Sequence, residues 1–156
     1  MRPSSSLVRS AALDIIGPGW LEGRTVWDLC CGSGAFGLEC LSAGAGRCVF
    51  VDRDRSACSF VTSVLAELGG SGRGTVVCSD LTGLDTAGLE RPDAVFLDPP
   101  YSSKSLYSWA EGTDWRTLIR PGGVLMIESA SDEAVVAGMH TRKYGGTCLH
   151  WRRFEE

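Results

Sequence analysis

Short apolar runs recur along the chain, and amphipathic segments or turn signals separate each run from the next. Runs of four to six apolar or β-branched residues predict buried strands, because the strands of a parallel sheet are covered on both faces. Segments between them with apolar residues at helical spacing predict helices. We expect strands over 25–30, 47–52, 75–78, 94–97 and 123–127, and helices over 4–16, 35–43, 55–68 and about 109–119.

The pattern changes near the C-terminus. Residues 139–144 and 147–154 flank Gly145-Gly146, which predicts a β-hairpin with a primed two-residue turn. Strands that alternate with helices form a parallel sheet with right-handed crossovers, and the hairpin adds antiparallel strands at one edge. We therefore expect an α/β fold with a mostly parallel seven-stranded sheet and helices on both faces, formed by residues 1–156 as a single domain.

A glycine-rich loop, Gly32-Ser33-Gly34-Ala35-Phe36-Gly37, joins the first expected strand to a helix. Its glycines permit a tight turn and a close approach of a ligand to the backbone, and the helix N-terminus offers N–H groups. Asp52 ends the next strand about 20 residues beyond the loop, where a carboxylate can accept both ribose hydroxyls of a nucleoside. Together, the loop and the carboxylate predict a nucleotide or nucleoside cofactor.

Two further carboxylates concern the identity of that cofactor. Asp28 precedes the loop, where it suits a cationic ligand such as the sulfonium and amino groups of S-adenosylmethionine better than the pyrophosphate of a dinucleotide. The alternative is that Asp28 accepts hydrogen bonds from the backbone of the loop. Asp80 follows the third strand and can meet an adenine amino group, although Asp also ends many strands for purely local reasons.

The most informative motif follows the fourth strand. Two prolines stop the strand and stiffen the loop, at the edge of the sheet where open α/β folds bind ligands. The motif presents a carboxylate, backbone carbonyls and an aromatic ring, which suit a flat base that carries an amino group. An ordinary turn is the alternative, since consecutive prolines are common in loops. The motif is Asp98-Pro99-Pro100-Tyr101.

Composition limits the classes of function. The formal net charge is −4, so a nucleic acid would have to be met by a local basic patch. No run approaches the roughly 18 apolar residues of a membrane helix, and no signal-peptide segment follows Met1. The seven cysteines form no C-x-x-C pair, and neither histidine lies at metal-ligand spacing. We therefore expect reduced, mostly buried thiols, no metal, and a cytoplasmic location.

The order of these motifs resembles the RsmD-type methyltransferases of bacteria, which belong to the S-adenosylmethionine-dependent amino-methyltransferases. The likeness runs from Arg2-Pro3-Ser4 through 32–39, 50–52 and 93–101 to Ile127-Glu128 and the terminal hairpin. It implies a Rossmann-like class I methyltransferase fold and S-adenosylmethionine as the cofactor. It also implies methyl transfer to guanine N2 in small-subunit (16S) ribosomal RNA. We expect a monomer, and because the net charge is negative we expect it to act on a small-subunit assembly intermediate rather than on bare RNA.

The resemblance and the motifs together give three sets of candidate residues. The expected catalytic residues are those of the loop after the fourth strand, where acceptors would hold the target amine and the tyrosine would stack on a flipped base: Asp98, Pro99, Pro100 and Tyr101. The expected cofactor contacts are Asp28, Cys30, Gly32, Ser33, Gly34, Gly37, Asp52, Arg53, Asp80, Leu81 and Asp98. Expected RNA contacts, each of which could equally be a solvated surface charge, are Arg2, Arg9, Lys104, Arg142, Lys143, Arg152 and Arg153.

Three other functions remain open from the sequence. A DNA adenine-N6 methyltransferase uses the same tetrapeptide but generally carries a target-recognition domain. A dinucleotide-dependent dehydrogenase would share the glycine loop, but a carboxylate at Asp28 would not help it to bind a pyrophosphate. A non-catalytic cofactor-binding scaffold would act through a partner subunit. Three tryptophans are expected to pack in the core rather than to stack on bases: Trp109, Trp115 and Trp151.

Overall fold

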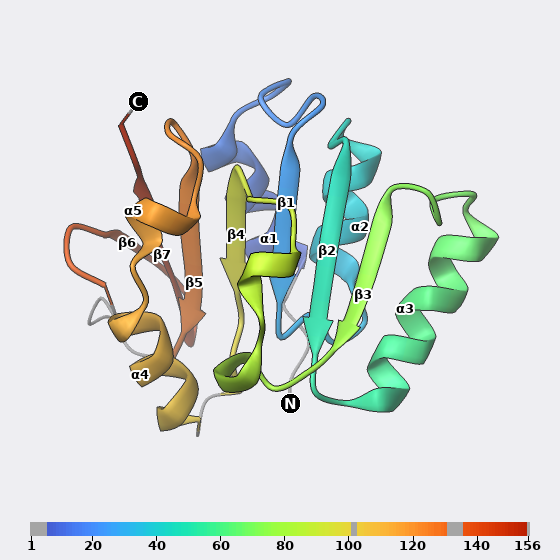
Figure 1. The fold of residues 1–156 in the computed structure, drawn as a ribbon. Coiled ribbons are helices and arrows are strands. Elements are labelled where there is room, and N and C mark those ends of the chain that lie inside the picture. The colour runs from blue at the N-terminus through green and yellow to red at the C-terminus, as the bar shows by residue number, and fades with distance from the viewer. Residues whose placement is uncertain (1–5, 101–102, 131–135, 156) are drawn as a thin grey trace.

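The computed structural model describes residues 6–100, 103–130 and 136–155, in which a seven-stranded sheet lies between two layers of helices (Figure 1). The strand order is β3-β2-β1-β4-β5-β7-β6. The first five strands pair in parallel, and β7 pairs antiparallel with both β5 and β6. The strands are β1 Thr25–Leu29, β2 Arg47–Asp52, β3 Gly74–Cys78, β4 Ala94–Leu97, β5 Val124–Ser129, β6 His140–Tyr144 and β7 Thr147–Arg153.

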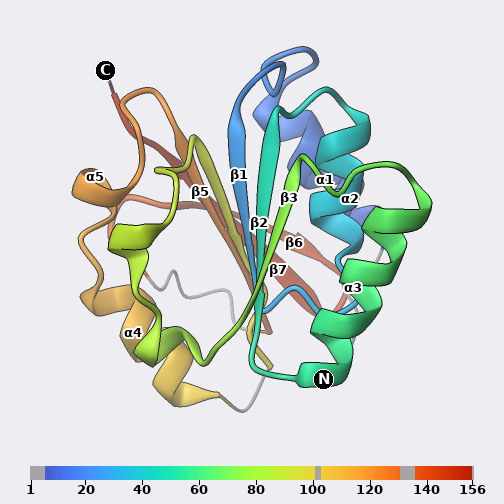
Figure 2. The same cartoon turned by 45° about the vertical axis from the view of Figure 1, so that its right-hand side comes forward.

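Helices cover both faces of the sheet (Figure 2). Helices α1, α2 and α3 pack on one face, and α4 and α5 pack on the other together with the two short 3₁₀ helices. Every residue of β1, β4 and β5 is buried, as expected for parallel strands that are covered on both sides. The helices are α1 Ser6–Ile16, α2 Ala35–Ser42, α3 Arg55–Glu67, η1 Leu81–Gly83, η2 Thr86–Gly88, α4 Lys104–Gly112 and α5 Trp115–Leu118.

One helix prediction was wrong. The single helix expected over 109–119 is two helices, and the first of them begins earlier, at Lys104. The chain leaves the helical conformation at Thr113, whose ψ is 135°. Asp114 then caps α5, because its side chain accepts from the backbone N–H of Thr117 at 3.4 Å.

Each face of the sheet has its own hydrophobic core, and aromatic rings and cysteine thiols contribute to both. Trp109 and Trp115 meet edge to face at 5.7 Å, and the Trp115 indole donates to the carbonyl of Ala110 at 2.8 Å, which confirms that these two rings pack. All seven cysteines are free thiols, and five of them are buried. His150 is fully buried, and its two ring nitrogens lie 2.8 Å from Ser129 Oγ and 2.7 Å from Thr141 Oγ1.

Because the first five strands run in the same direction, the two ends of the sheet along the strand direction differ. The carboxyl ends of β1 to β5 meet at one edge, which we call the carboxyl edge, at the bottom of Figure 1. The hairpin turn lies at this edge too, because Cys148 pairs with Ser129, the last residue of β5. The other end of β7 lies at the opposite, amino edge, where Arg153 pairs with Val124. Gly145 has a φ of 62°, the sign that a type II′ turn requires at its first central residue.

None of the helices among the described residues is long and apolar enough to cross a lipid bilayer.

Candidate active site

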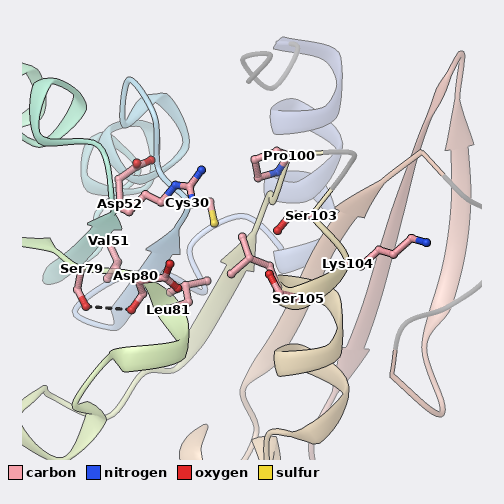
Figure 3. A pocket seen from close by; sticks show the side chains of 12 residues that line it. Cys30, Val51, Asp52, Ser79, Asp80, Leu81, Pro100, Ser103, Lys104 and Ser105 are labelled. Carbon is pink, nitrogen blue, oxygen red and sulfur yellow. Dashed lines mark hydrogen bonds between the residues drawn. The ribbon is translucent and has the colours of Figure 1, made fainter.

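A cavity of about 330 Å³ opens at the carboxyl edge, between the ends of β2 and β3 and the start of α4 (Figure 3). Its volume lies in the range of small-molecule sites. Five of the expected cofactor contacts line it, together with one proline of the Asp-Pro-Pro loop and one expected RNA contact. The lining residues are Cys30, Val51, Asp52, Arg53, Ser79, Asp80, Leu81, Pro100, Ser103, Lys104, Ser105 and Leu106.

Asp52 connects the glycine loop to the end of β2. Its side chain is only 3% exposed, and each carboxylate oxygen accepts one backbone N–H. Oδ2 accepts from Gly32 and Oδ1 accepts from Asp54, both at 2.9 Å. Each carboxylate oxygen has two lone-pair positions, so Asp52 retains acceptor capacity on the side that lines the cavity.

Asp28 is buried beneath the loop and faces the backbone of α2. Its Oδ2 accepts from the N–H of Gly37 at 3.0 Å, so it makes the backbone bond that was the alternative interpretation of this residue. Burial raises the pKa of the Asp28 carboxyl to about 8; the Gly37 hydrogen bond opposes this rise, and the charge of Asp52 adds to it. Asp28 does not line the 330 Å³ cavity.

The three glycines of the loop have different roles. Gly32 and Gly34 have φ angles of 53° and 78°, which L side chains rarely adopt, so they permit the turn. Gly37 allows α2 to approach the sheet, because a Cβ there would lie 2.4 Å from Phe50 Cε1 and 2.7 Å from Cys48 Sγ. The Gly37 N–H is also taken by Asp28. Gly37 was expected among the cofactor contacts, and this packing leads us to leave it out of the set that we propose.

Cys30 is the one non-glycine residue with a positive φ in the described part of the chain, at 58°. Such a conformation costs about 1–3 kcal/mol and tends to occur where a site requires it. Burial raises the pKa of the Cys30 thiol to about 12, and the charges of Asp52 and Asp98 contribute. The thiol is therefore neutral at physiological pH, and Cys30 lines part of the cavity.

Asp80 lies two residues beyond β3 and makes the local bonds that were the alternative interpretation of this residue. Its Oδ1 accepts from the N–H of Thr82 at 3.0 Å and from the Thr82 hydroxyl at 2.9 Å, which caps η1. These bonds lower the pKa of the Asp80 carboxyl. The side chain is nevertheless exposed and lines the cavity beside the buried Leu81.

Asp98 follows β4 directly. Its N–H donates to the carbonyl of Leu29 at 3.3 Å, so the backbone continues along β1, and its side chain is 8% exposed. Pro99 is buried and Pro100 is half-buried on the cavity wall. Tyr101, the expected stacking residue, lies outside the described residues, as does Arg2.

Sequence reasoning missed one wall of the cavity. The start of α4 supplies Ser103, Ser105 and Leu106, whereas Lys104 extends away from the other lining side chains (Figure 3). These positions were missed because the helix was expected to begin at 109. The serine before Lys104 was the available signal, since Ser is common at the residue that precedes a helix.

The expected RNA contacts separate into several environments. Arg9 pairs with Glu39 at 3.4 Å, and Arg153 donates to the carbonyls of Ile15 and Ile16 at the end of α1 at 2.8 and 2.6 Å. These two arginines therefore have partners within the protein, and their expected contact with RNA stays a prediction. Exposed cations at the carboxyl edge are Lys104, Arg142 and Lys143, and Arg152 lies toward the amino edge.

Comparisons with known proteins identify the family and the fold of the chain. The family model described as "Conserved hypothetical protein 95" matches residues 1–152. A protein of Bacillus subtilis (strain 168) described as "Putative rRNA methyltransferase YlbH" is 33% identical over 130 residues, which are 81% of this chain and 70% of that protein. The two solved structures below confirm the expected Rossmann-like methyltransferase fold.

The first structure is "Putative methyltransferase yhhF" from Escherichia coli, with a TM-score of 0.77 and 24% identity. The match covers 99% of this chain and 88% of the Escherichia coli chain. The second is an RNA methyltransferase from Salinibacter ruber in complex with S-adenosyl-L-homocysteine. Its TM-score is 0.75 at 14% identity, and the match covers 99% of this chain and 95% of the Salinibacter ruber chain.

Proposed function

Because the chain belongs to the family described as Conserved hypothetical protein 95, we propose that it transfers a methyl group from S-adenosylmethionine to the N2 amine of a guanine in small-subunit ribosomal RNA. The observation that carries the proposal is the position of a nucleoside-sized cavity beside the Asp-Pro-Pro loop at one edge of the sheet. The name of the Bacillus subtilis relative supports ribosomal RNA as the substrate class. The S-adenosylhomocysteine bound to the Salinibacter ruber enzyme supports the cofactor.

The residues of the cavity fit the adenosine part of this cofactor. Asp52 retains acceptor positions for ribose hydroxyls, and the exposed Asp80 carboxylate can accept from an adenine amino group. Three apolar side chains on the cavity wall suit the faces of an adenine ring: Val51, Leu81 and Leu106. Arg53 and Cys30 complete this part of the site.

The methionine part of the cofactor would lie toward the glycine loop and the end of β4. The proposed contacts there are Asp28, Gly32, Ser33, Gly34 and Asp98. A protonated Asp28 cannot pair with a cation, so this role requires a bound sulfonium or amino group to lower its pKa from about 8. When bound, S-adenosylmethionine supplies a methyl group that its sulfonium makes electrophilic.

The Asp-Pro-Pro-Tyr loop would hold the target base. The exocyclic amine of guanine is a poor nucleophile, because its lone pair is delocalised into the ring. The Asp98 carboxylate and the Pro99 carbonyl accept its two N–H groups and so orient the lone pair. Tyr101 stacks on the flipped base, and the proton released from the amine passes to Asp98 or to water. Catalysis in this proposal is mainly positioning.

Binding of RNA would depend on a few local cations. With a net charge of −4, the chain has little general attraction for phosphates. Lys104, Arg142 and Lys143 lie at the same edge as the cavity and are proposed to contact RNA near the target. We expect a small-subunit assembly intermediate in the cytoplasm to be a better substrate than bare RNA, because bound proteins hold the target loop in shape, and we expect the enzyme to act as a monomer.

Methyl transfer with labelled S-adenosylmethionine tests the proposal. The substrates are undermethylated small-subunit particles, bare small-subunit RNA and duplex DNA, and nucleoside mass spectrometry identifies the product. We expect N2-methylguanosine, formed fastest on the particles. Methyladenine in DNA would replace the proposal with the adenine-N6 alternative, and equal rates on bare RNA and particles at physiological salt would contradict the assembly-dependent part.

Calorimetry tests the cofactor separately. S-adenosylhomocysteine should bind and NAD should not. Asp52→Ala should weaken binding by roughly 1.5–3 kcal/mol, the scale of hydrogen bonds to a charged group. Binding of NAD without any response to S-adenosylhomocysteine would favour the dehydrogenase alternative. Binding of S-adenosylhomocysteine without methyl transfer to any of the three substrates would favour the scaffold.

A further inference from the structure

A second cavity, of about 460 Å³, lies at the base of the C-terminal hairpin. It is at the amino edge, because its β7 residues lie beside the first residues of β5. β5 is six residues long, which places this cavity about 17–20 Å from the carboxyl edge. It is lined, among others, by Arg116, His140, Trp151, Arg152, Arg153 and Glu155.

The cavity lies where β7 extends beyond its partner. The pairing of β6 with β7 ends at His140 and Trp151, so Arg152 and Arg153 pair with β5 only. Gly138, with a φ of 78°, also lines the cavity. The cavity therefore lies beside the part of β7 that has no partner in β6, between Gly138, the end of β7 and Arg116 of α5.

Positive charge dominates the lining. Of the described residues that line the cavity, three carry a guanidinium group and one, Glu155, carries a carboxylate. Arg153 places its Nη2 on the carbonyls of Ile15 and Ile16 at the end of α1, and we therefore assign contact with a ligand to Arg116 and Arg152. Arg116 is exposed on α5.

Arg152 is held in place before any ligand arrives. Its Nη1 donates to the carbonyl of Ala137 at 2.9 Å, and its guanidinium lies 4.9 Å from the centre of the Phe154 ring. Gly138 packs against it, since a Cβ there would lie 3.4 Å from Arg152 Cζ, an ordinary van der Waals contact. A guanidinium has five N–H donors. The side chain can therefore bind an anion without first losing its conformational freedom.

Two rings and an exposed strand extend the cavity. His140 and Trp151 pack with ring centres 5.4 Å apart, and the half-buried Trp151 lines the cavity. From His140, the exposed residues of β6 continue through Arg142 and Lys143 to the carboxyl edge. Cations therefore lie in the cavity beside the start of β6 and on β6 itself near its other end, an arrangement that suits a polyanion better than a single small anion.

From these observations we propose that the 460 Å³ cavity binds a phosphodiester segment of the RNA substrate, remote from the target nucleotide. This inference rests on the proposed RNA substrate and adds to it a second point of attachment. Arg116 and Arg152 contact phosphate oxygens there, and RNA follows β6 from the cavity to the carboxyl edge. The second attachment sets the orientation of the RNA, and thereby which base reaches the Asp-Pro-Pro loop.

The test measures how RNA binding depends on salt. Filter binding of a transcript of small-subunit ribosomal RNA is recorded over a series of KCl concentrations, for the parent chain and for Arg116→Gln/Arg152→Gln. The magnitude of the slope of log K against log salt should fall by about 1.5, since each phosphate contact contributes roughly 0.7–0.9. The dissociation constant should rise roughly tenfold or more.

The matched control is Arg47→Gln/Arg120→Gln. These arginines carry the same charge and also lie toward the amino edge, but both face Glu90 and neither lines the cavity. Binding of S-adenosylhomocysteine should be unchanged in both double variants, which shows that they are folded. Arg116→Gln alone, a change at an exposed side chain, should lower the magnitude of the slope by about half as much as the cavity double variant.

Three outcomes would contradict parts of this scheme. If the cavity variant and the control variant share one slope and one affinity, the cavity does not bind RNA, and the proposed function stands. If Arg152→Gln reduces RNA binding but Arg116→Gln does not, a local structural effect at Arg152 replaces the inference. If the parent chain binds S-adenosylhomocysteine but no RNA, the proposed substrate fails together with the inference.

Discussion

The parallel half of the sheet and the C-terminal hairpin distribute their polar residues in different ways. In the parallel half, Asp52, Asp80 and Asp98 follow three different strands and all reach the carboxyl edge, two of them on one cavity. In the hairpin, four basic residues on two adjacent strands reach both edges. Arg142 and Lys143 are near the turn, and Arg152 and Arg153 are at the amino edge.

Strand direction explains the difference. Parallel strands have their carboxyl ends at one edge, so residues that are far apart in sequence converge there. The strands of a hairpin run in opposite directions, so residues at equal distances from the turn lie together, and residues close to and far from the turn are separated. A carboxylate that ends or follows a parallel strand can therefore be placed at the carboxyl edge from the sequence alone. The edge at which a cation of the hairpin lies depends on the number of residues between it and the turn.

The largest expected effect tests whether the strand-end carboxylates perform the chemistry. Asp98→Ala should lower the rate of methyl transfer by about 10²–10³, the scale for one preorganised polar group. Affinity for S-adenosylhomocysteine should fall by no more than a few fold, because Asp98 is one of several proposed contacts of the methionine part. Single-turnover rates and calorimetry on the same preparation measure the two quantities.

Asp98→Asn is the matched control for this change. The amide keeps one carbonyl oxygen that can accept from the target amine, but it cannot take up a proton. A rate between those of the parent and Asp98→Ala would indicate that hydrogen-bond acceptance is the main role. Retained turnover in Asp98→Ala would remove Asp98 from the mechanism and leave the hairpin cations as the functional part of the edge.

Asp28 provides a test in stability, because it is a carboxylate of the parallel half that the fold buries. Its pKa is about 8 in the folded protein and about 3.8 when unfolded. Between these values the unfolded chain releases a proton that the folded chain keeps. Rising pH therefore favours unfolding, by at most about 1.4 kcal/mol per pH unit. Below about pH 4 both states are protonated, and the contribution of Asp28 is fully present.

Asp28→Asn removes this dependence. The free energy of unfolding of the variant, relative to the parent, should increase from pH 5 to pH 8 within the window set by those two pKa values. The Asn carbonyl can still accept from the Gly37 N–H, so any cost of the substitution should be the same at every pH. Urea unfolding at several pH values measures the difference, and a difference that does not change with pH would show that Asp28 is ionised in the folded protein.

Gly37→Ala tests whether the third loop glycine serves packing rather than ligand binding. Its Cβ would lie 2.4 Å from Phe50 Cε1, so we expect a loss of about 1–3 kcal/mol in the free energy of unfolding. The control is Gly72→Ala, because nothing lies within 4 Å of a Cβ there. If Gly37→Ala keeps full stability but loses affinity for S-adenosylhomocysteine, Gly37 returns to the cofactor contacts.

The strands were predictable because each is a short apolar run. The residues expected for β2 and β4 are those observed, and the other strands differ by one to three residues at their ends. The division between α4 and α5 was not predictable from spacing, because apolar residues continue across Thr113 and Asp114. There the hydrogen bond from the Thr117 N–H to the Asp114 side chain begins a new helix, and hydrophobic periodicity carries no information about capping.

The site was predictable where it depends on motif order and not where it depends on packing. Strand ends brought Asp52 and Asp80 to one cavity, as expected. The positive φ of Cys30 is a local conformation, and the packing of Gly37 against Phe50 depends on the approach of α2 to β2; one sequence shows neither. The bonds from Arg153 to Ile15 and Ile16 join residues that are 138 and 137 positions apart, respectively.

The smallest expected effects separate the two ends of the hairpin. Arg142→Gln/Lys143→Gln should weaken RNA binding by a few fold and lower the magnitude of the salt slope by about 1–2, with the melting temperature unchanged, because both side chains are exposed on β6. Arg153→Gln should instead lower the melting temperature and leave the salt slope of RNA binding unchanged. Its guanidinium donates to two carbonyls at the C-terminal end of α1, where a cation contributes about 0.3–1 kcal/mol. Thermal unfolding and filter binding on both variants measure the two effects. If Arg153→Gln lowers the salt slope with full stability, Arg153 is an RNA contact, and the separation of the hairpin into a binding end and a structural end is wrong.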